Sequence, residues 1–318
     1  MHSVFLDQGS MGGDDLDYSI LDQLVPGYIT YAKTEANEVL ERIQGAEIVM
    51  TNKVVLDRDI LSSVPTLKLI CVTATGTNNV DLVCARENNI AVSHARAYAT
   101  PSVVEHVFAL LTNLIRHLND YQRASIDGRW AQSPYFSYMN KSISELAGKT
   151  MGIIGYGELG RAVAQVAKAF GMRVLIAQRP GSDTLELGRL PMDEFLKQVD
   201  VLSLHCPLED NTRNLVDRHA FELMPNHAIL INTARGGIVN EVDLLDALKS
   251  GAIAAAGIDV LEEEPPRQGN VLLGESLENL IVTPHVAWAS RESRQRLLAE
   301  IVDNIKAYKA GKRRNRVD

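Results

Sequence analysis

Three side chains suited to anion binding and proton transfer each lie beside the end of an apolar run. Arg235 follows ILINTA, Glu264 lies in GIDVLEEEPP and His285 lies in LIVTPHVAW. A guanidinium binds anions such as carboxylates through paired hydrogen bonds, and an imidazole exchanges a proton near neutral pH. Ligands of open parallel sheets bind outside the carboxyl ends of the strands. We therefore expect the three side chains to converge on one crevice.

Each of the three has an ordinary structural interpretation when it is taken alone. A single arginine after a strand is usually a surface cation, and a single buried histidine usually serves packing. Glu264 has two acidic neighbours, Glu262 and Glu263, and by itself could belong to a solvated acidic run. The other motifs of the chain are needed to choose between these structural roles and a shared functional site.

The segment GIIGYGELG has glycines at the spacing of a dinucleotide-binding turn. Gly155, Gly157 and Gly160 follow the predicted strand TMGII and open the predicted helix RAVAQVAKAF. In that context the first glycine allows a tight turn and the second lets a pyrophosphate approach the backbone, while the third allows close helix packing. The N–H groups and the dipole at the helix start favour an anion. The pattern predicts a dinucleotide cofactor, with a purely structural turn as the alternative.

The residues after the next predicted strand bear on the type of dinucleotide. NAD-binding chains carry an acid there that accepts a hydrogen bond from the ribose, whereas this chain has Gln178 and Arg179. A guanidinium is suited to bind a 2′-phosphate, and no carboxylate repels it. The pattern favours NADP(H), with NAD(H) as the alternative if Gln178 bonds the ribose. Glu158 lies inside the turn, where a carboxylate is unfavourable beside a pyrophosphate unless it points away.

The elements that must position these residues alternate between short apolar runs and helical patterns over almost all of the 318 residues. This alternation predicts an α/β fold with two series of parallel strands and helices on both faces of each sheet. The segment from Thr100 and Pro101 to residue 125 predicts one long helix, of the kind that links domains or forms a subunit interface. EVDLLDALKSG predicts a helix that ends at Gly251.

The composition is that of a globular chain, with 46% hydrophobic residues, 23% charged residues and a formal net charge of −8. The acidic balance argues against nucleic acid as a partner, and the basic cluster KAGKRRNRVD is expected to be a solvated terminus. The widely spaced Cys71, Cys84 and Cys206 predict buried thiols, so neither disulfides nor a metal site is expected. No apolar run spans a bilayer and the first residues predict a strand, which favours a cytoplasmic protein.

Six segments in order resemble the D-isomer-specific 2-hydroxyacid dehydrogenases, and the resemblance covers essentially the whole chain. They are VTATGTNNVDLVCARENNIAV, LAGKTMGIIGYGELGRAVA, HCPL, MPNHAILINTARGGIVNE, GIDVLEEEPP and TPHVAWAS. Within the family, the pairing of TATGTNNVD with HVAWAS is most similar to the glycerate dehydrogenase or hydroxypyruvate reductase branch. The resemblance implies two doubly wound parallel-sheet domains. One is a flavodoxin-like substrate, or lid, domain of residues 1–99 plus 291–318, and the other is an NAD(P)-binding Rossmann domain of residues 100–290.

The resemblance also implies a reaction, the transfer of a hydride between NAD(P)H and a small 2-keto or 2-hydroxy acid. Arg235 is expected to hold the substrate carboxylate and to fix which face of the carbonyl is reduced. His285 is expected to donate a proton to the carbonyl oxygen, while Glu264 orients its ring. Glu264 is selected over its acidic neighbours because it precedes Pro265 and follows Asp259 at the family spacing.

Further contacts are implied by the same resemblance. The loop Thr75-Gly76-Thr77 matches the family's substrate loop, whose N–H groups help to bind the carboxylate, and Trp288 matches an active-site aromatic residue. Trp130 is considered for a role in a partner subunit's site. His205 is the competing histidine, but its segment lies along the cofactor in the family. The implied cofactor contacts are Thr75, Gly155, Gly157, Glu158, Leu159, Gly160, Gln178, Arg179, Cys206, Thr233 and Asp259, the last at the nicotinamide carboxamide.

The expected protein is a homodimeric enzyme that reduces hydroxypyruvate or glyoxylate, with the long helix from Pro101 in its interface. Two alternatives stay open. One is another member of the family, such as a phosphoglycerate dehydrogenase. The other is a non-catalytic, dinucleotide-sensing interaction protein, because the fold family includes transcriptional corepressors. Turnover of a keto acid separates the enzyme from the sensor.

Overall fold

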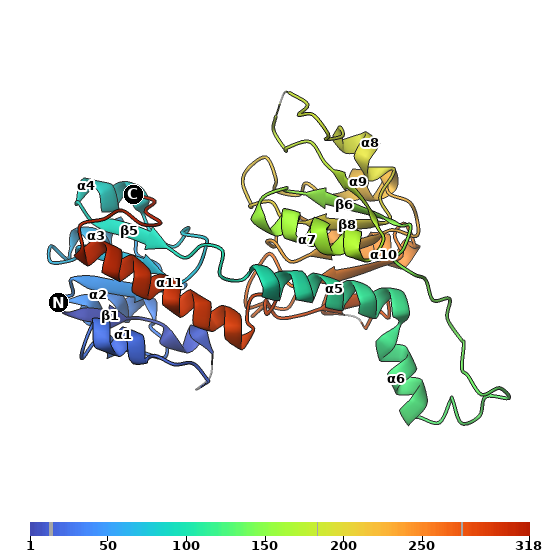
Figure 1. Ribbon diagram of the computed structural model, residues 1–318, viewed down its shortest axis with the longest axis horizontal. Coiled ribbons are helices and arrows are strands. Elements are labelled where there is room, and N and C mark those ends of the chain that lie inside the picture. The colour runs from blue at the N-terminus through green and yellow to red at the C-terminus, as the bar shows by residue number, and fades with distance from the viewer. Residues whose placement is uncertain (13–14, 183, 275) are drawn as a thin grey trace. The chain divides into compact units, whose positions relative to one another are not determined.

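The chain forms two compact units, shown in a computed structural model that describes residues 1–12, 15–182, 184–274 and 276–318 (Figure 1). Unit 1 consists of Met1–Ala99 and Trp288–Asp318, and unit 2 consists of Thr100–Ala287. The chain thus returns to unit 1 at Trp288, slightly before position 291 of the implied boundary.

Unit 1 is built on a parallel sheet with the strand order β2-β1-β3-β4-β5. This is the flavodoxin order, which confirms the expected fold of this part of the chain. The strands are β1 (Ser3–Phe5), β2 (Ile29–Thr30), β3 (Ile48–Thr51), β4 (Leu69–Val72) and β5 (Ala91–His94). The helices are α1 (Ser19–Leu24), α2 (Val39–Ile43), α3 (Arg58–Ser62), α4 (Leu82–Glu87) and α11 (Arg291–Lys309), with 3₁₀ turns at Gln8–Met11 and Ala36–Glu38.

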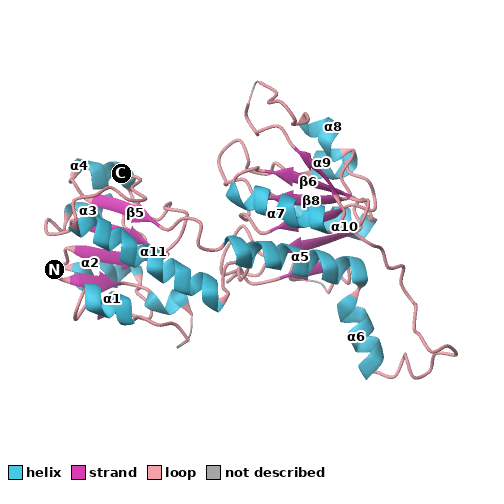
Figure 2. Cartoon of the chain, in the orientation of Figure 1, coloured by secondary structure: helices cyan, strands magenta, loops and turns pink. Residues whose placement is uncertain are grey.

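Helices cover both faces of the unit 1 sheet, which is why its central strands are continuously apolar (Figure 2). Val49 of β3 belongs to a core shared with α2, α3 and α4. Its neighbours Ile48 and Met50 belong to a second core, shared with α1 and α11. Successive side chains of a strand point to opposite faces, so one strand supplies both cores.

The expectation of a solvated terminus holds for the first half of the basic C-terminal tail, since residues 309–313 are exposed, but residues 314–318 are half-buried and contact unit 1. Arg316 forms an antiparallel bridge with Ser93 of β5. Arg314 lies 2.6 Å from a carboxylate oxygen of Glu300 on α11 and donates to Asn304 over 2.6 Å. The charges of Arg314 and Arg316 are used for ion pairs and hydrogen bonds within unit 1.

Unit 2 is built on a six-stranded parallel sheet with the order β11-β10-β9-β8-β6-β7. The strands are β6 (Thr150–Ile154), β7 (Arg173–Ile176), β8 (Val201–Leu204), β9 (Ile229–Asn232), β10 (Ala255–Ile258) and β11 (Leu280–Val282). The helices are α5 (Thr100–Arg116), α6 (Leu118–Ile126), α7 (Glu158–Ala169), α8 (Met192–Leu196), α9 (Arg218–Leu223) and α10 (Glu241–Ser250). The chain crosses from β7 to β8 on the other side of β6, so the strand order switches beside β6, where ligands of such sheets bind.

Both faces of the unit 2 sheet are covered as well. Phe195, Phe221 and Leu244, from α8, α9 and α10, share a core with Leu230 of β9. Helices α5 and α7 pack against each other, and α5 contacts β9, β10 and β11. A Cβ on Gly257 of β10 would lie 3.0 Å from Leu110 of α5, so the glycine allows this close approach.

The helix that starts at Thr100 is interrupted, so the prediction of one continuous helix is wrong. His117 adopts a left-handed conformation with φ 51°, which ends α5 and lets α6 begin in a new direction. The prediction for α10 is confirmed, because Gly251 caps it with φ 73°. The three cysteines are buried and free, as expected. Among the described residues, no helix is both long and apolar enough to cross a membrane.

Candidate active site

Arg235, Glu264 and His285 follow three neighbouring strands of unit 2, namely β9, β10 and β11. Because these strands are parallel, their carboxyl ends lie at the same edge of the sheet. The three segments that carry these residues thus leave the sheet at the same edge. The contacts of each side chain indicate its role in the site.

Glu264 and His285 form a hydrogen-bonded pair. One carboxylate oxygen of Glu264, Oε2, lies 2.6 Å from Nδ1 of His285, and the other accepts from the N–H of Leu261 over 2.9 Å. The backbone therefore fixes the carboxylate, and the carboxylate fixes the imidazole. Within the described chain, Nε2 of His285 has no partner, so this nitrogen is free to exchange a proton with a ligand.

Asp259 holds the loop that carries His285. It is 1% exposed and accepts from the hydroxyl of Thr283 and from the N–H groups of Val286 and Ala287, over 2.5, 3.0 and 2.9 Å. Burial would raise the pKa of Asp259, but hydrogen bonds from His106, Thr283 and the loop lower it below its ordinary value.

The backbone carbonyl of Asp259 also accepts from the N–H of His285 over 2.8 Å, where His285 has φ 54°. A positive φ is unfavourable for a residue with a Cβ, so these bonds hold the catalytic candidate in a conformation it would otherwise avoid. Both oxygens of this buried carboxylate are engaged within unit 2, and the nicotinamide carboxamide contact that the resemblance implied stays a prediction. Sequence reasoning missed this positioning role, which depends on contacts between segments.

Arg235 is exposed, and one guanidinium nitrogen donates to the carbonyl of Ala234 over 2.7 Å. The glycine behind it has a steric role, because a Cβ on Gly236 would lie 1.9 Å from the carbonyl oxygen of Leu261. Leu261 also bonds Glu264. The segment after β9 is thus packed directly on the segment that carries Glu264.

The glycine turn between β6 and α7 has the geometry of a dinucleotide site. Gly155 has φ 91°, and a Cβ there would lie 2.4 Å from the nitrogen of Cys206. A Cβ on Gly160 would lie 2.2 Å from the carbonyl oxygen of Gly155. A Cβ on Gly157, in contrast, would meet nothing within 4 Å. Two glycines serve the fold, and the third leaves open space where a pyrophosphate would approach the backbone.

Two buried polar atoms support the same interpretation. Oγ1 of Thr233, after β9, and Nδ1 of His205, after β8, have no hydrogen-bond partner within the described residues. Buried groups of this kind are costly unless a ligand or water bonds them, so these residues fit a bound dinucleotide. Burial lowers the pKa of His205 to about 4. Its ring is neutral near neutral pH, which leaves His285 as the stronger candidate for the proton donor.

The other implied cofactor residues surround this turn. Glu158, at the start of α7, accepts a hydrogen bond from the hydroxyl of Thr100 at the start of α5. Leu159 is half-buried in the same helical turn. Gln178 donates to the carbonyl of Ser182 over 2.6 Å and so shapes the loop after β7. Arg179 is exposed, and no carboxylate among the described residues pairs with it.

Cys206 is part of the packing around the glycine turn. Its side chain is 6% exposed, and burial raises the pKa of its thiol to about 11. The thiol therefore stays protonated and unreactive near neutral pH.

The remaining implied residues belong to unit 1 or to the segment after α6. Thr75 is exposed after β4, and Gly76 follows it. Trp288 is half-buried and packs edge-on against Tyr98, with ring centroids 6.3 Å apart. Trp130 is 50% exposed and donates to the carbonyl of Phe136. Within the described residues, no group of three or more His, Cys, Asp or Glu side chains could hold a metal ion.

A Rossmann-type sheet, an open glycine turn and a carboxylate–histidine pair at neighbouring strand ends define a nicotinamide-dependent dehydrogenase. The comparison with known families agrees. The model of the D-isomer specific 2-hydroxyacid dehydrogenase NAD-binding domain matches residues 108–287. The chain belongs to this family of oxidoreductases, which confirms the resemblance seen in the sequence.

Curated relatives match over nearly the full chain. The chain is 44% identical over 316 residues to a glycerate dehydrogenase of Methylorubrum extorquens, covering 99% of this chain and 98% of the relative. It is 37% identical over 316 residues to a hydroxypyruvate reductase of Blautia hydrogenotrophica, covering 98% of each. These names place the chain among NAD(P)-linked reductases of small 2-keto acids.

Solved structures share the whole fold. The TT0316 protein of Thermus thermophilus has a TM-score of 0.87 at 31% identity, with 100% of both chains covered. An acyclic imino acid reductase, Bsp5, in complex with NADPH and D-Arg also has a TM-score of 0.87, at 27% identity and the same coverage. Both likenesses confirm the expected pair of parallel-sheet α/β domains.

Proposed function

We propose that the protein reduces hydroxypyruvate or glyoxylate with NADPH, as a D-glycerate dehydrogenase type of enzyme. The observation that carries this proposal is the Glu264–His285 pair, held by Leu261 and Asp259 at a sheet edge that it shares with Arg235. The names of the relatives from Methylorubrum extorquens and Blautia hydrogenotrophica support the choice of substrate.

Each of the three residues has one part in the proposed reaction. The reduced nicotinamide supplies a hydride when it is bound. Arg235 holds the carboxylate of the keto acid, so that one face of the carbonyl is presented. His285 donates the proton on Nε2 to the carbonyl oxygen, where negative charge develops during reduction. Glu264 accepts the hydrogen bond from Nδ1 and so holds the ring for this donation.

The preference for NADP(H) over NAD(H) rests on the loop after β7. Gln178 is neutral and uses its amide to hold this loop. Arg179 is exposed and pairs with no carboxylate among the described residues, so it is available for a 2′-phosphate. The remaining cofactor contacts are proposed for Thr75, Leu159, Thr233 and the backbone of Glu158. The imino acid reductase with a similar fold was solved with NADPH, which agrees with this preference.

Unit 1 is proposed to be the substrate domain. Its loop Thr75-Gly76-Thr77 has exposed and half-buried residues at the carboxyl end of β4, and its N–H groups are proposed to bind the carboxylate. Trp288 is proposed to shape the substrate pocket. Its packing against Tyr98 would hold the ring in place.

The assembly is proposed to be a homodimer through the segment of residues 118–143, which we call the arm. Figure 1 shows α6 and the following loop extending away from the body of unit 2. Large apolar side chains are exposed along the arm, which marks a surface that another chain covers. They are Leu118, Ile126, Trp130, Tyr135, Phe136, Met139 and Ile143.

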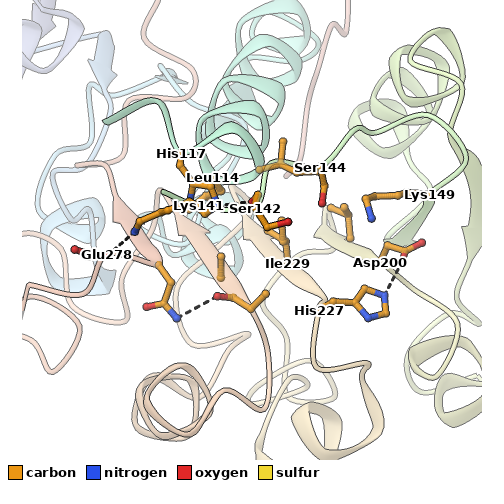
Figure 3. Close-up of a pocket in the computed structure, with 15 residues that line it drawn as sticks. Leu114, His117, Lys141, Ser142, Ser144, Lys149, Asp200, His227, Ile229 and Glu278 are labelled. Atoms are coloured by element: carbon orange, nitrogen blue, oxygen red, sulfur yellow. Dashed lines mark hydrogen bonds and ion pairs between the residues drawn. The ribbon is translucent and has the colours of Figure 1, made fainter. Parts of the chain in front are cut away.

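A cavity beside the arm belongs to the same proposed interface. It has a volume of about 420 Å³ and lies at the amino ends of β8, β9 and β10, the edge of the sheet opposite to His285 (Figure 3). Lys141 and Ser142 of the arm line it together with Leu114 of α5. Its position makes it unsuitable as the substrate site and suitable for contact with a second copy. We also propose that the protein binds no nucleic acid and is located in the cytoplasm.

The proposal is tested by a panel of keto acids assayed with NADPH and NADH in parallel. Hydroxypyruvate, glyoxylate, pyruvate and phosphohydroxypyruvate separate the proposed activity from the phosphoglycerate branch. We expect the highest kcat/KM with hydroxypyruvate or glyoxylate and NADPH. In Arg235→Ala, loss of the charged hydrogen bonds to the carboxylate should lower kcat/KM at least about a hundredfold.

Arg213→Ala is the matched control, because Arg213 is an exposed arginine of the same unit that pairs with Glu262 at the surface. It should keep nearly full activity. Unchanged turnover in Arg235→Ala would refute the proposed mechanism. Binding of a dinucleotide without turnover of any keto acid would favour a sensor instead of an enzyme.

A further inference from the structure

The last residue of β5, His94, contacts the loop of residues 75–77. Its ring nitrogen Nδ1 lies 2.7 Å from the carbonyl oxygen of Thr75. A carbonyl only accepts hydrogen bonds, so Nδ1 carries the proton and donates. The next residue, Ala95, donates its N–H to the carbonyl of Ala74 over 3.0 Å. His94 and the residue that follows β5 thus hold Thr75, the first residue of the loop, and Ala74 just before it.

The loop is held at its far end as well. The amide of Asn79 donates to the carbonyl of Val54 over 2.9 Å, and its own carbonyl accepts from the N–H of Leu56 over 2.8 Å. Between these anchors, the N–H groups of Gly76 and Thr77 donate to no group in the described parts of the chain. The loop therefore presents free donors on a backbone that is fixed on both sides.

The bond from His94 sets the direction of one of these donors. The peptide between Thr75 and Gly76 is planar and trans, so its carbonyl and its N–H point in opposite directions. Because His94 holds the carbonyl of Thr75, the N–H of Gly76 points away from His94. Without this bond the peptide plane could rotate and present a carbonyl oxygen where a donor is needed, which would repel a carboxylate.

His94 is itself held by the C-terminal part of unit 1. Its N–H donates to the carbonyl of Asn315 over 3.1 Å, and its carbonyl accepts from the amide of Asn304 over 2.9 Å. Asn304 lies on α11, and its other amide atom accepts from Arg314 over 2.6 Å. The imidazole thus stands on a backbone that both the last helix and the tail hold in place.

We propose that His94 is a positioning residue, whose Nδ1–H fixes the peptide between Thr75 and Gly76 so that the N–H of Gly76 donates to the substrate carboxylate. The inference rests on the proposed function, because it takes the loop of residues 75–77 to bind that carboxylate. It adds a residue outside the catalytic group and gives the structured tail a part in substrate binding.

Three substitutions test this role. In His94→Asn, the amide nitrogen is separated from Cα by the same number of bonds as Nδ1, so it can donate to Thr75. In His94→Gln the amide nitrogen stands one bond further out, at the distance of Nε2, and His94→Ala has no donor. We expect His94→Ala and His94→Gln to raise the KM for hydroxypyruvate about tenfold, the effect of one weakened hydrogen bond. The kcat and the KM for NADPH should stay within about twofold of wild type.

The comparison between His94→Asn and His94→Gln separates a positioning hydrogen bond from a packing role. Rescue of KM by His94→Asn but not by His94→Gln, with melting temperatures alike, supports the proposal, since a general packing role would not distinguish the two amides in this way. A KM that is unchanged in His94→Ala, or raised equally in all three variants, overturns it while leaving the proposed function intact. If the wild-type protein reduces no 2-keto acid, the proposed function fails, and the role of His94 in it fails too.

Discussion

The imidazole of His285 is fixed through three groups of unit 2. Glu264 binds Nδ1, the carbonyl of Asp259 binds the backbone N–H, and the carboxylate of Asp259 binds the next two N–H groups of the loop. Only one of the three adjacent acids contacts the ring. Glu262 pairs with Arg213 at 3.4 Å, with both side chains largely exposed, so that pair contributes little. This difference makes Glu262 a matched control for Glu264.

Replacement of Glu264 by glutamine should lower the rate of keto acid reduction. In Glu264→Gln, the amide oxygen can still accept from the N–H of Leu261, which places the amide nitrogen against Nδ1 of His285. Two N–H groups then face each other, so His285 loses the acceptor that holds its ring for proton donation from Nε2. We expect kcat to fall about a hundredfold, the scale of a general acid contribution. Glu262→Gln should keep wild-type kcat in the same steady-state assay, and equal rates for the two variants would argue against the pair.

The element that carries the cofactor chemistry is the turn between β6 and α7, where neighbouring glycines have different physical tasks. Gly155 needs its positive φ of 91°, and a Cβ would overlap the backbone of Cys206. Gly157 has φ −81° and open space around it, so the fold itself would accept alanine there. The glycine at this position is explained only by what must come close to it.

An alanine at Gly157 should therefore weaken cofactor binding, whereas an alanine at Gly155 should destabilise the fold. Gly157→Ala should fold with a melting temperature close to wild type, but its methyl group should occupy the space of the pyrophosphate and raise the Kd for NADPH at least about tenfold. Gly155→Ala should lower the melting temperature markedly, since both strain and overlap destabilise the turn. Calorimetry and a binding titration on the same samples check both. Full affinity for NADPH in Gly157→Ala would show that the cofactor does not approach this backbone.

The elements differ in how far the sequence could predict them. Strand–helix alternation and the glycine spacing are local signals, and they predicted both sheets and the turn at Gly155. Gly251, which predicted the end of α10, is a local signal as well. The break at His117 was missed because the helical pattern continues through a residue that adopts φ 51°. The role of Asp259 and the docking of the tail depend on contacts between distant segments, such as Ser93 with Arg316, which no local pattern records.

At the scale of the whole molecule, the apolar side chains exposed on the arm have no explanation in a single chain. Phe136 is 94% exposed and Met139 is 79% exposed, although both are apolar. Exposure of such side chains to water is unfavourable, by about 25 cal/mol for each Å² of apolar surface. The cavity beside Lys141 and Ser142 leaves further surface of the same region uncovered. A second copy of the chain would bury both, and a symmetric pair is the commonest way for a soluble protein to do so.

Charges placed on the arm should therefore separate the proposed dimer. In the double variant Phe136→Glu and Met139→Glu, pairing would bury two unpaired carboxylates in each chain, which is strongly unfavourable. We expect light scattering during size-exclusion chromatography to give the mass of two chains for the wild-type protein and of one chain for this variant. Val242→Glu is the control, because Val242 is a 56% exposed apolar residue of α10, outside the arm, and its substitution should leave the mass unchanged. A wild-type mass of one chain, or a double variant that stays paired, would rule out the arm as the interface.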